Sequence, residues 1–269
     1  MSTILPLTHS AAILTDVQVL APKSFNNSVY IDINRLSKQT AWAHGFMTAY
    51  AVWIGPVLLA AVFVAAYAMA WWRGANRAAS LLALGGLGTL VAVGLNQVVG
   101  HAAKELRPYA THPQALVLVG KTSDYSFPSD HSVVAGGLTV SLLLALGGAV
   151  WEGRGQHVAG KLEAPHAGRF PSRTAIRVFA AVNVVLGLFL CFDRLYVGAH
   201  YPGDVVAGYL LASATVVAVS FLRPAAYRLS DLMEPTIFGV VLRRPAATDG
   251  SRHCCRWWAG RPLPARLHR

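Results

Sequence analysis

The sequence predicts an all-α protein, a polytopic bundle of about five membrane helices with a possible surface helix before them. The first indication is composition, since 54% of the residues are hydrophobic and 13% are charged, whereas soluble domains carry roughly a quarter charged residues. The second is a set of five apolar stretches, each near the roughly 20 residues that cross a bilayer. They lack the strict alternation of a membrane β-barrel. The stretches run over 44–70, 79–100, 132–151, 176–192 and 205–222.

The two ends of the chain differ from its apolar middle. Residues 1–43 begin without the basic region of a cleavable signal, and we expect an extracytoplasmic or interfacial segment that contains a short surface helix. Residues 44–222 form the predicted transmembrane domain. Residues 223–269 are rich in Arg and Pro, which predicts a basic cytoplasmic tail that is partly disordered.

The net charge of +11 is distributed by side of the membrane. With five crossings and an outside start, most Lys and Arg residues fall in the inner pieces 71–78, 152–175 and 223–269. This distribution follows the positive-inside rule, and it is a poor argument for nucleic-acid binding. We therefore predict a multi-pass protein of the cell (inner) membrane whose connections 101–130 and 194–204 face the extracytoplasmic side.

Both of these outer connections are dense in polar residues, and a helical bundle brings them to one face of the membrane. In the second, Pro202 favours a helix start, so Asp204 falls in the first turn of the last membrane helix, where the dipole favours a carboxylate. Asp204 then accepts a hydrogen bond from one imidazole nitrogen of His200 and leaves the other free to attack. A capping Asp beside an interfacial His is the alternative interpretation.

Two arginines at the outer ends of membrane helices are candidate phosphate clamps. Arg194 lies six residues before His200, and Arg107 precedes Pro108, which we expect to end the second membrane helix. A guanidinium fork matches phosphate oxygens and keeps its charge at any relevant pH. The alternative is that both arginines are interfacial anchors.

The third membrane helix opens with residues 127–131, Phe-Pro-Ser-Asp-His, and we expect Pro128 in its first turn. The free N–H groups of a helix start bind anions, and the Ser129 hydroxyl adds a donor. His131 is placed to protonate a departing oxygen as a general acid. Because Asp130 would repel a phosphate, we expect it to pair with one of the two arginines or to shift a histidine pKa. An ordinary capped helix with an exposed His is the alternative.

No cofactor and no metal are predicted. Cys191 lies in an apolar stretch, and Cys254 and Cys255 lie in the predicted cytoplasmic tail, where thiols stay reduced. Beyond the residues already named, no carboxylate-rich or His-rich set has metal-ligand spacing. The predicted chemistry therefore uses side chains alone.

These residues resemble the motifs of the type 2 phosphatidic acid phosphatase superfamily, membrane lipid phosphatases related to vanadium haloperoxidases. The motif Pro-Ser-x-His corresponds to residues 128–131, and Arg-x5-His-x3-Asp corresponds to Arg194, His200 and Asp204. The resemblance covers roughly 96–222, with the motifs in the same order and at the same spacing.

The resemblance implies a role for each residue. His200 attacks phosphorus to form a phosphohistidine, Asp204 orients it, and His131 protonates the leaving group. Water later hydrolyses the intermediate. The implied phosphate-binding residues are Arg107, Ser129 and Arg194.

The first motif departs from the family pattern. A Lys normally precedes the Arg of Arg-Pro by seven residues, but that position here is Gly100. Lys104 lies one helical turn further on, and His101 is adjacent. We predict that Lys104 is the substitute phosphate ligand, with His101 or a clamp of two arginines as the alternatives.

Asp130 stands where many members have Gly, so residues 126–131 resemble the bacitracin-resistance branch. Those enzymes hydrolyse undecaprenyl diphosphate to the monophosphate and recycle the lipid carrier of peptidoglycan synthesis. The resemblance thus implies a polyprenyl or other phospholipid substrate. A phosphatidate or phosphatidylglycerophosphate phosphatase is the alternative with the same chemistry, and a lipid phosphotransferase and a non-catalytic transporter are alternatives of other classes. A transporter would carry polar groups near the mid-membrane, whereas here they lie at helix ends. The oligomeric state is left open.

Overall fold

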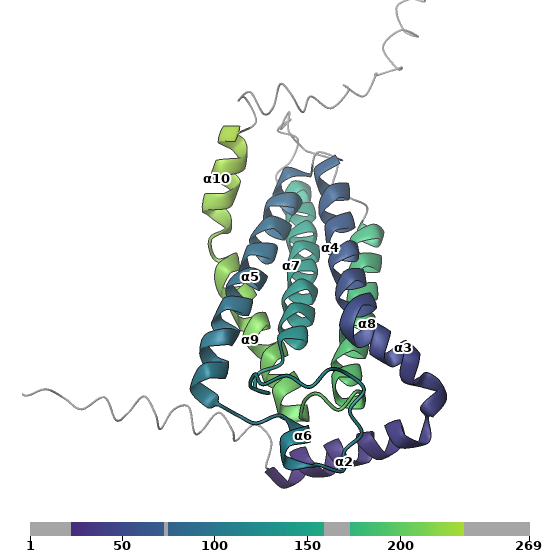
Figure 1. The fold of residues 1–269 in the computed structure, drawn as a ribbon. Helices are drawn as coiled ribbons and strands as arrows, with labels where there is room; N and C mark the ends of the chain where they lie inside the picture. The colour runs from purple at the N-terminus through teal and green to yellow at the C-terminus, as the bar shows by residue number, and fades with distance from the viewer. Residues whose placement is uncertain (1–22, 73–74, 159–172, 234–269) are drawn as a thin grey trace, which may run out of the picture. The chain divides into compact units, whose positions relative to one another are not determined.

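The computed structural model describes residues 23–72, 75–158 and 173–233, and within these ranges every regular element is a helix (Figure 1). The predicted all-α class is therefore confirmed. The elements are α2 (Lys23–Gln39), the short helices η2 (Ala41–Ala43), α3 (His44–Ala49) and η3 (Tyr50–Ile54), then α4 (Gly55–Trp72), α5 (Asn76–Ala103), α6 (Pro108–Thr111), α7 (Asp130–Val158), α8 (Arg173–Tyr196), α9 (Pro202–Ser220) and α10 (Arg223–Met233).

Each predicted apolar stretch coincides with a helical segment. In the part of the chain that the structure describes, four segments are long and apolar enough to cross a membrane, and α7 adds a shorter apolar run over Asp130–Leu146. A helix satisfies its backbone groups internally, as lipid requires, so apolar length alone located these elements. The four long segments are Ala41–Trp72, Arg77–Thr111, Thr174–Tyr196 and Pro202–Ser220.

Helix α7 packs against α5, α8 and α9 and so forms the middle of the bundle (Figure 1). Its contact with α9 is close, because a Cβ added at Gly136 would lie 2.6 Å from the backbone oxygen of Tyr209. Towards α8, Leu138 and Leu190 are buried in one apolar cluster. Membrane helices associate through such close packing rather than through escape from water. The packing fixes the ends of these helices relative to one another.

Two helix boundaries differ from the prediction. Helix α5 ends at Ala103, where Lys104 caps it with a left-handed φ of 53°, so Pro108 begins the short α6 instead of ending the second membrane helix. Helix α7 begins at Asp130, so Pro128 precedes its first turn. Proline lacks an N–H and has a fixed φ, which suits a helix start as well as the position after a helix end. The residue type alone could not choose between these places.

The surface helix expected within residues 1–43 is α2, which lies across one end of the bundle (Figure 1). Its Asn34 side chain pairs with both backbone groups of Leu116, donating to the carbonyl oxygen at 2.7 Å and accepting from the N–H at 3.0 Å. Asn26 accepts a hydrogen bond from the N–H of Gly203 at 2.9 Å. Helix α2 thereby anchors the connection after α6 and the start of α9.

Three predicted parts of the chain extend beyond the described residues. These are the start of the N-terminal segment (1–22), the middle of the predicted inner loop (159–172) and most of the predicted tail (234–269). Helices α7 and α8 reach into the predicted loop from both sides, and α10 occupies the first part of the predicted tail.

Candidate active site

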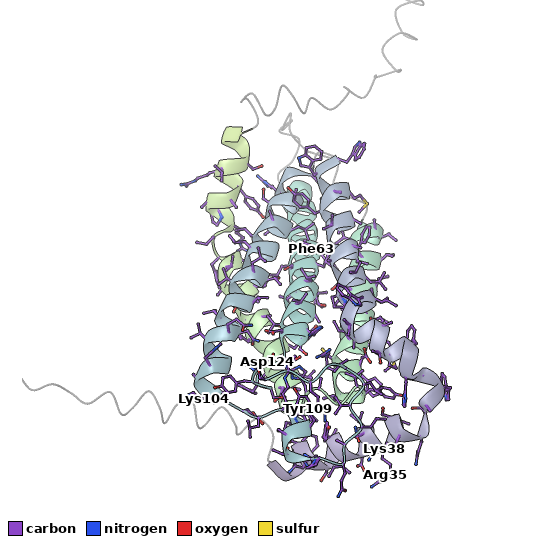
Figure 2. All side chains as sticks on the ribbon, viewed as in Figure 1. Arg35, Lys38, Phe63, Lys104, Tyr109 and Asp124 are labelled. Carbon is purple, nitrogen blue, oxygen red and sulfur yellow. The ribbon has the colours of Figure 1, made fainter. Side chains whose placement is uncertain are left out.

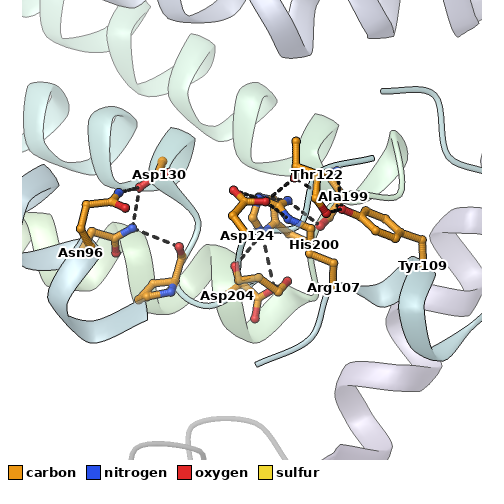
Figure 3. Close-up of polar contacts among 12 residues, drawn as sticks. Asn96, Arg107, Tyr109, Thr122, Asp124, Asp130, Ala199, His200 and Asp204 are labelled. Carbon is orange, nitrogen blue, oxygen red and sulfur yellow. Dashed lines mark hydrogen bonds and ion pairs between the residues drawn. The ribbon is translucent and has the colours of Figure 1, made fainter. Parts of the chain in front are cut away.

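The predicted site residues other than Lys104 come from four places in the chain and gather at the end of the bundle that α2 covers. They lie just before α6, at the start of α7, near the end of α8 and at the start of α9. Figure 3 shows part of this cluster with its hydrogen bonds. Most of these side chains are buried, so the cluster lies inside the fold. Its members are Arg107, Ser129, His131, Arg194, His200 and Asp204.

The hydrogen bonds of His200 determine which ring nitrogen has a free lone pair. Nδ1 lies 2.8 Å from the backbone carbonyl oxygen of Ser126. A carbonyl oxygen can only accept, so Nδ1 carries the hydrogen and the lone pair is on Nε2. Nε2 in turn lies 3.3 Å from Nη1 of Arg107. An unprotonated imidazole nitrogen beside a guanidinium is the arrangement that attack on an anionic phosphorus needs.

The surroundings of His200 also keep its ring neutral. Burial lowers the pKa of His200 well below its ordinary value of 6.5, and the positive charges of Arg194 and Arg107 lower the pKa further. Both effects disfavour the protonated ring. At neutral pH Nε2 therefore keeps its lone pair, which in this structure accepts the hydrogen bond from Nη1 of Arg107.

Asp204 does not make the hydrogen bond that the sequence predicts. Its Oδ2 is 3.5 Å from Nδ1 of His200, and it accepts instead from the Ser126 hydroxyl and from the N–H of Tyr201, the latter at 2.8 Å. Helix α9 begins at Pro202, as predicted, and Asp204 belongs to the capping box at this start. The capping box directs the carboxylate back towards the backbone N–H before the helix. Asp204 thus holds the Ser126 hydroxyl, and its carboxylate lies beside the His200 ring without a hydrogen bond to it.

Ser129 and Arg194 bring hydrogen-bond donors to the same cluster. Within the described residues, Oγ of Ser129 and Nε of Arg194 are buried and have no hydrogen-bond partner. A buried donor left unpaired costs about 1–3 kcal/mol, and an oxygen-rich anion such as phosphate would satisfy both. His131 interacts electrostatically with Arg194, His200 and Arg107, so the second imidazole belongs to this cluster as well.

Asp130 pairs with neither arginine, but the other expected role holds: its negative charge raises the pKa of His200, against the larger lowering effects of burial and the two arginines. Oδ1 of Asp130 accepts hydrogen bonds from Nδ2 of Asn96 at 2.7 Å and from Nε2 of Gln97 at 2.9 Å (Figure 3). Asn96 also donates to the carbonyl oxygen of Pro128 at 3.1 Å. Both amides lie on α5, which packs beside the start of α7. Asp130 therefore fastens the start of α7 to α5.

Arg107 forms a two-point ion pair with Asp124, in the connection between α6 and α7. Its Nε donates to Oδ1 at 3.0 Å and its Nη2 to Oδ2 at 2.8 Å. The hydroxyl of Thr122 donates to Oδ1 of the same carboxylate. The hydroxyl of Tyr109 donates to the Thr122 carbonyl oxygen at 2.8 Å. These contacts fix the side of Arg107 that faces away from His200.

The predicted site omits two contributors that the structure reveals. Ser126 binds His200 through its backbone carbonyl oxygen, and a backbone contact cannot be predicted from the pattern of side chains. Asp124 is the one acidic residue in the sequence between Glu105 and Asp130. A single carboxylate in the connection just before residues 128–131 was the feature of the sequence from which Asp124 could have been suspected.

The structure does not bring Lys104 to the site. Lys104 is exposed at the end of α5 (Figure 2), and among the described residues its ammonium makes no hydrogen bond or ion pair. Nδ1 of His101 contacts the carbonyl oxygen of Gln97 in its own helix at 2.7 Å. A Cβ added at Gly100 would lie 3.1 Å from the carbonyl oxygen of Phe127. The position of the family Lys thus lies close against the backbone of Phe127, and the guanidinium groups that the structure brings to the cluster are those of Arg107 and Arg194.

The fold is similar to that of a transmembrane PAP2-type phosphatidylglycerolphosphate phosphatase from Bacillus subtilis. The TM-score is 0.53, the sequence identity is 18%, and the match covers 81% of this chain and 94% of the other. At this identity the similarity concerns the fold alone.

Two sequence relatives bear the name undecaprenyl-diphosphatase. BcrC of Bacillus subtilis is 24% identical over 196 residues, which are 73% of this chain and 78% of the relative. A protein of Sulfolobus acidocaldarius is 28% identical over 124 residues, 46% of each chain. This chain therefore spans about half the length of the Sulfolobus relative.

The sequence profile of the PAP2 superfamily matches residues 79–228, more than half of the chain. The matched range contains every residue of the predicted site, from Lys104 to Asp204. The chain therefore belongs to the PAP2 superfamily, the phosphatase family that its motifs resemble.

Proposed function

We propose that the chain is a lipid phosphatase that hydrolyses undecaprenyl (polyprenyl) diphosphate to the monophosphate and phosphate. The observation that carries the proposal is the hydrogen bond from Nδ1 of His200 to the Ser126 carbonyl oxygen, which leaves the lone pair on Nε2, beside Arg107. The names of the two sequence relatives support a diphosphate substrate.

The proposed reaction has two steps. In the first, Nε2 of His200 forms a bond to the terminal phosphorus while the bond from phosphorus to the lipid monophosphate oxygen breaks. His131, which takes up a proton when the charge of the bound diphosphate offsets the positive charges of Arg107 and Arg194 around it, gives that proton to the departing oxygen. In the second, His131 takes a proton from water as the water oxygen attacks phosphorus. The phosphorus–nitrogen bond then breaks, which frees phosphate and restores His200.

The remaining residues stabilise charge in these steps. The two arginines and the Ser129 hydroxyl bind the non-bridging oxygens, which agrees with the unpaired buried donors of Ser129 and Arg194. Phosphorylation of Nε2 makes the His200 ring cationic. Asp204, with Oδ2 3.5 Å from Nδ1, opposes that positive charge. No side chain in this scheme requires a metal ion.

We also propose that the site faces the extracytoplasmic side of the cell membrane. Arg77 lies at the start of α5, and Arg173 and Arg177 lie at the start of α8, the helix ends opposite the site. Basic residues favour the cytoplasmic side. A diphosphate lipid exposed at the outer leaflet would then meet the site without crossing the membrane.

The proposal is tested by phosphate release from undecaprenyl diphosphate, with purified full-length protein in detergent and excess EDTA. We expect turnover by the wild type and a loss of about 10³-fold or more in His200→Ala, because no other group supplies the nucleophile. The control is His44→Ala on α3, a ring that contacts the Ser37 carbonyl oxygen and lies outside the site. Its turnover should match the wild type.

Several outcomes would contradict the proposal. Undiminished release by His200→Ala would eliminate His200 as the nucleophile. Activity that disappears in EDTA and returns with Mg²⁺ would contradict the metal-free mechanism. A large preference for phosphatidylglycerophosphate in a parallel assay would assign the same chemistry to a glycerolipid.

A further inference from the structure

The proposed mechanism gives no role to the ion pair between Arg107 and Asp124. Arg107 is largely buried, with a side-chain exposure of 11%, whereas Asp124 is 57% exposed. Both nitrogens on one edge of the guanidinium, Nε and Nη2, are bound to the carboxylate. A phosphate clamp whose charge is already matched by a carboxylate needs an explanation, because the carboxylate weakens its attraction for an anion.

We propose that Asp124 is a positioning residue, which binds one edge of Arg107 so that Nη1 is held over the nucleophilic nitrogen of His200. This inference rests on the proposed function. It concerns how Arg107 is oriented, and it adds no step to the reaction.

The guanidinium group of Arg107 uses different nitrogens for its two sets of contacts. Nη1 donates to the carbonyl oxygen of Ala199 at 3.2 Å and lies 3.3 Å from Nε2 of His200 (Figure 3). Asp124 occupies the opposite edge. A phosphate oxygen can therefore approach Nη1 while the ion pair with Asp124 persists. The contact that must yield is the long one between Nη1 and Nε2.

Asp124 is itself held in place. Partial burial raises its pKa, but hydrogen bonds from Arg107 and Thr122 outweigh that effect, so the pKa of Asp124 lies below its ordinary value and the carboxylate stays charged. The segment that carries it is bound to α6, where the N–H of Thr122 donates to the hydroxyl of Tyr109 at 3.0 Å. Further back, Asn34 of α2 clamps Leu116. These contacts hold the Asp124 carboxylate in one position, which a positioning residue requires.

The two arginines of the site consequently differ in function. Arg194 is buried, its Nη1 donates to the carbonyl oxygen of Ala51 at 3.5 Å, and its Nε has no hydrogen-bond partner within the described residues. Its Nε is therefore open to a phosphate oxygen, and no carboxylate in that part of the chain forms an ion pair with it. Arg107 is paired with Asp124, and its Nη1 is directed at Nε2 of His200. Removal of the Asp124 charge should thus impair the chemical step, which depends on orientation, more than it impairs binding of phosphate.

The test compares Asp124→Asn with the wild type in the hydrolysis of undecaprenyl diphosphate. We expect kcat to fall about 10–100-fold, because a clamp misplaced by about 1 Å has an effect of this size. KM and the inhibition constant of inorganic phosphate should stay within about threefold of the wild type. Thr122→Val, which removes the hydroxyl that binds Oδ1, should lower kcat in the same way by a smaller factor.

The chain offers a matched control for the lost charge. Asp32→Asn on α2 removes a carboxylate that pairs with Arg35 at 3.3 Å, where both side chains are exposed, and its kinetics should equal those of the wild type. Thermal stability in detergent is measured for all variants, and kcat is expressed per folded protein.

Two results would overturn the positioning role. An unchanged or raised kcat in Asp124→Asn with tighter inhibition by phosphate would make Asp124 a competitor of the substrate. A lowered thermal stability with unchanged kcat per folded protein would make it a structural residue. Failure of the proposed function itself would appear separately, as undiminished turnover by His200→Ala.

Discussion

At the scale of single residues, the proposed chemistry depends on the protonation of His200. Its ring is buried, its Nδ1 hydrogen is given to a carbonyl oxygen, and two arginines lie near it. Only the neutral ring can use Nε2 as a nucleophile. In the proposed mechanism, the burial and the positive charges that favour this neutral form therefore matter as much as the ring itself.

The low pKa of His200 predicts the acidic side of the pH profile. We expect kcat/KM to lose half its value below pH 6.5, the ordinary histidine pKa, because burial and the two arginine charges oppose protonation of Nε2. The measurement is kcat/KM between about pH 4 and about pH 8. Arg107→Gln removes one positive charge and should move this limb to higher pH. A wild-type limb at or above pH 6.5 would refute the assignment.

Side-chain types predicted much of the site, and backbone groups account for what they missed. The spacing of Arg194, His200 and Asp204 was sufficient to place them in one cluster. The partner of Nδ1 was not predictable, because it is a backbone carbonyl oxygen. Every residue has such an oxygen, so the sequence does not distinguish Ser126 from its neighbours. The pairing of Asp124 with Arg107 depends on the path of an irregular connection, and hydrophobic periodicity carries no information about such a path.

At the scale of helices, the membrane segments were predictable and their ends were less so. Apolar length located the helices, because a chain in lipid has few alternatives. The end of α5 was missed because Lys104 takes a left-handed conformation that Gly or Asn usually signals. Predicted family membership is confirmed, whereas the roles of the individual site residues remain predictions.

The crossing of α7 and α9 gives a prediction at this scale. A Cβ added at Gly208 on α9 would lie 2.6 Å from the carbonyl oxygen of Ser129, so Gly208→Ala must displace the site end of α7. We expect kcat to fall about tenfold or more, consistent with the sensitivity of catalysis to small misplacements. Gly94→Ala on α5 is the control, since nothing lies within 4 Å of its added Cβ. Equal activity of the two variants would contradict this packing.

At the scale of the described bundle, α2 secures the end that contains the site. Besides the contacts of Asn34, Nζ of Lys38 donates to the carbonyl oxygen of Gln114 at 2.9 Å, and the ring of Tyr30 packs on that of Tyr201 with centroids 5.4 Å apart. The segment before the first membrane helix therefore supports residues far away in the sequence. An N-terminal surface helix was predicted, but these contacts were not, since no periodicity reports them.

The anchoring by α2 can be measured. Asn34→Ala leaves both backbone groups of Leu116 without their partner, which should lower stability by about 1–3 kcal/mol. It should also increase protease cleavage and hydrogen exchange in residues 112–124. Asn27→Ala, an exposed position on the same helix, serves as the control. If both variants exchange hydrogen in that segment at the wild-type rate, α2 does not anchor it.

The carbonyl oxygen that orients His200 has a consequence for genetic studies of this enzyme family. Every amino acid supplies the same oxygen at position 126, so no codon change deletes it, and a saturation screen there reports on the hydroxyl bound to Asp204. The group is instead altered by semisynthesis, with an ester in place of the amide between Ser126 and Phe127, since an ester carbonyl is a poorer acceptor. A backbone group that the proposed mechanism needs is thus beyond the reach of mutagenesis, although the structure shows its hydrogen bond directly.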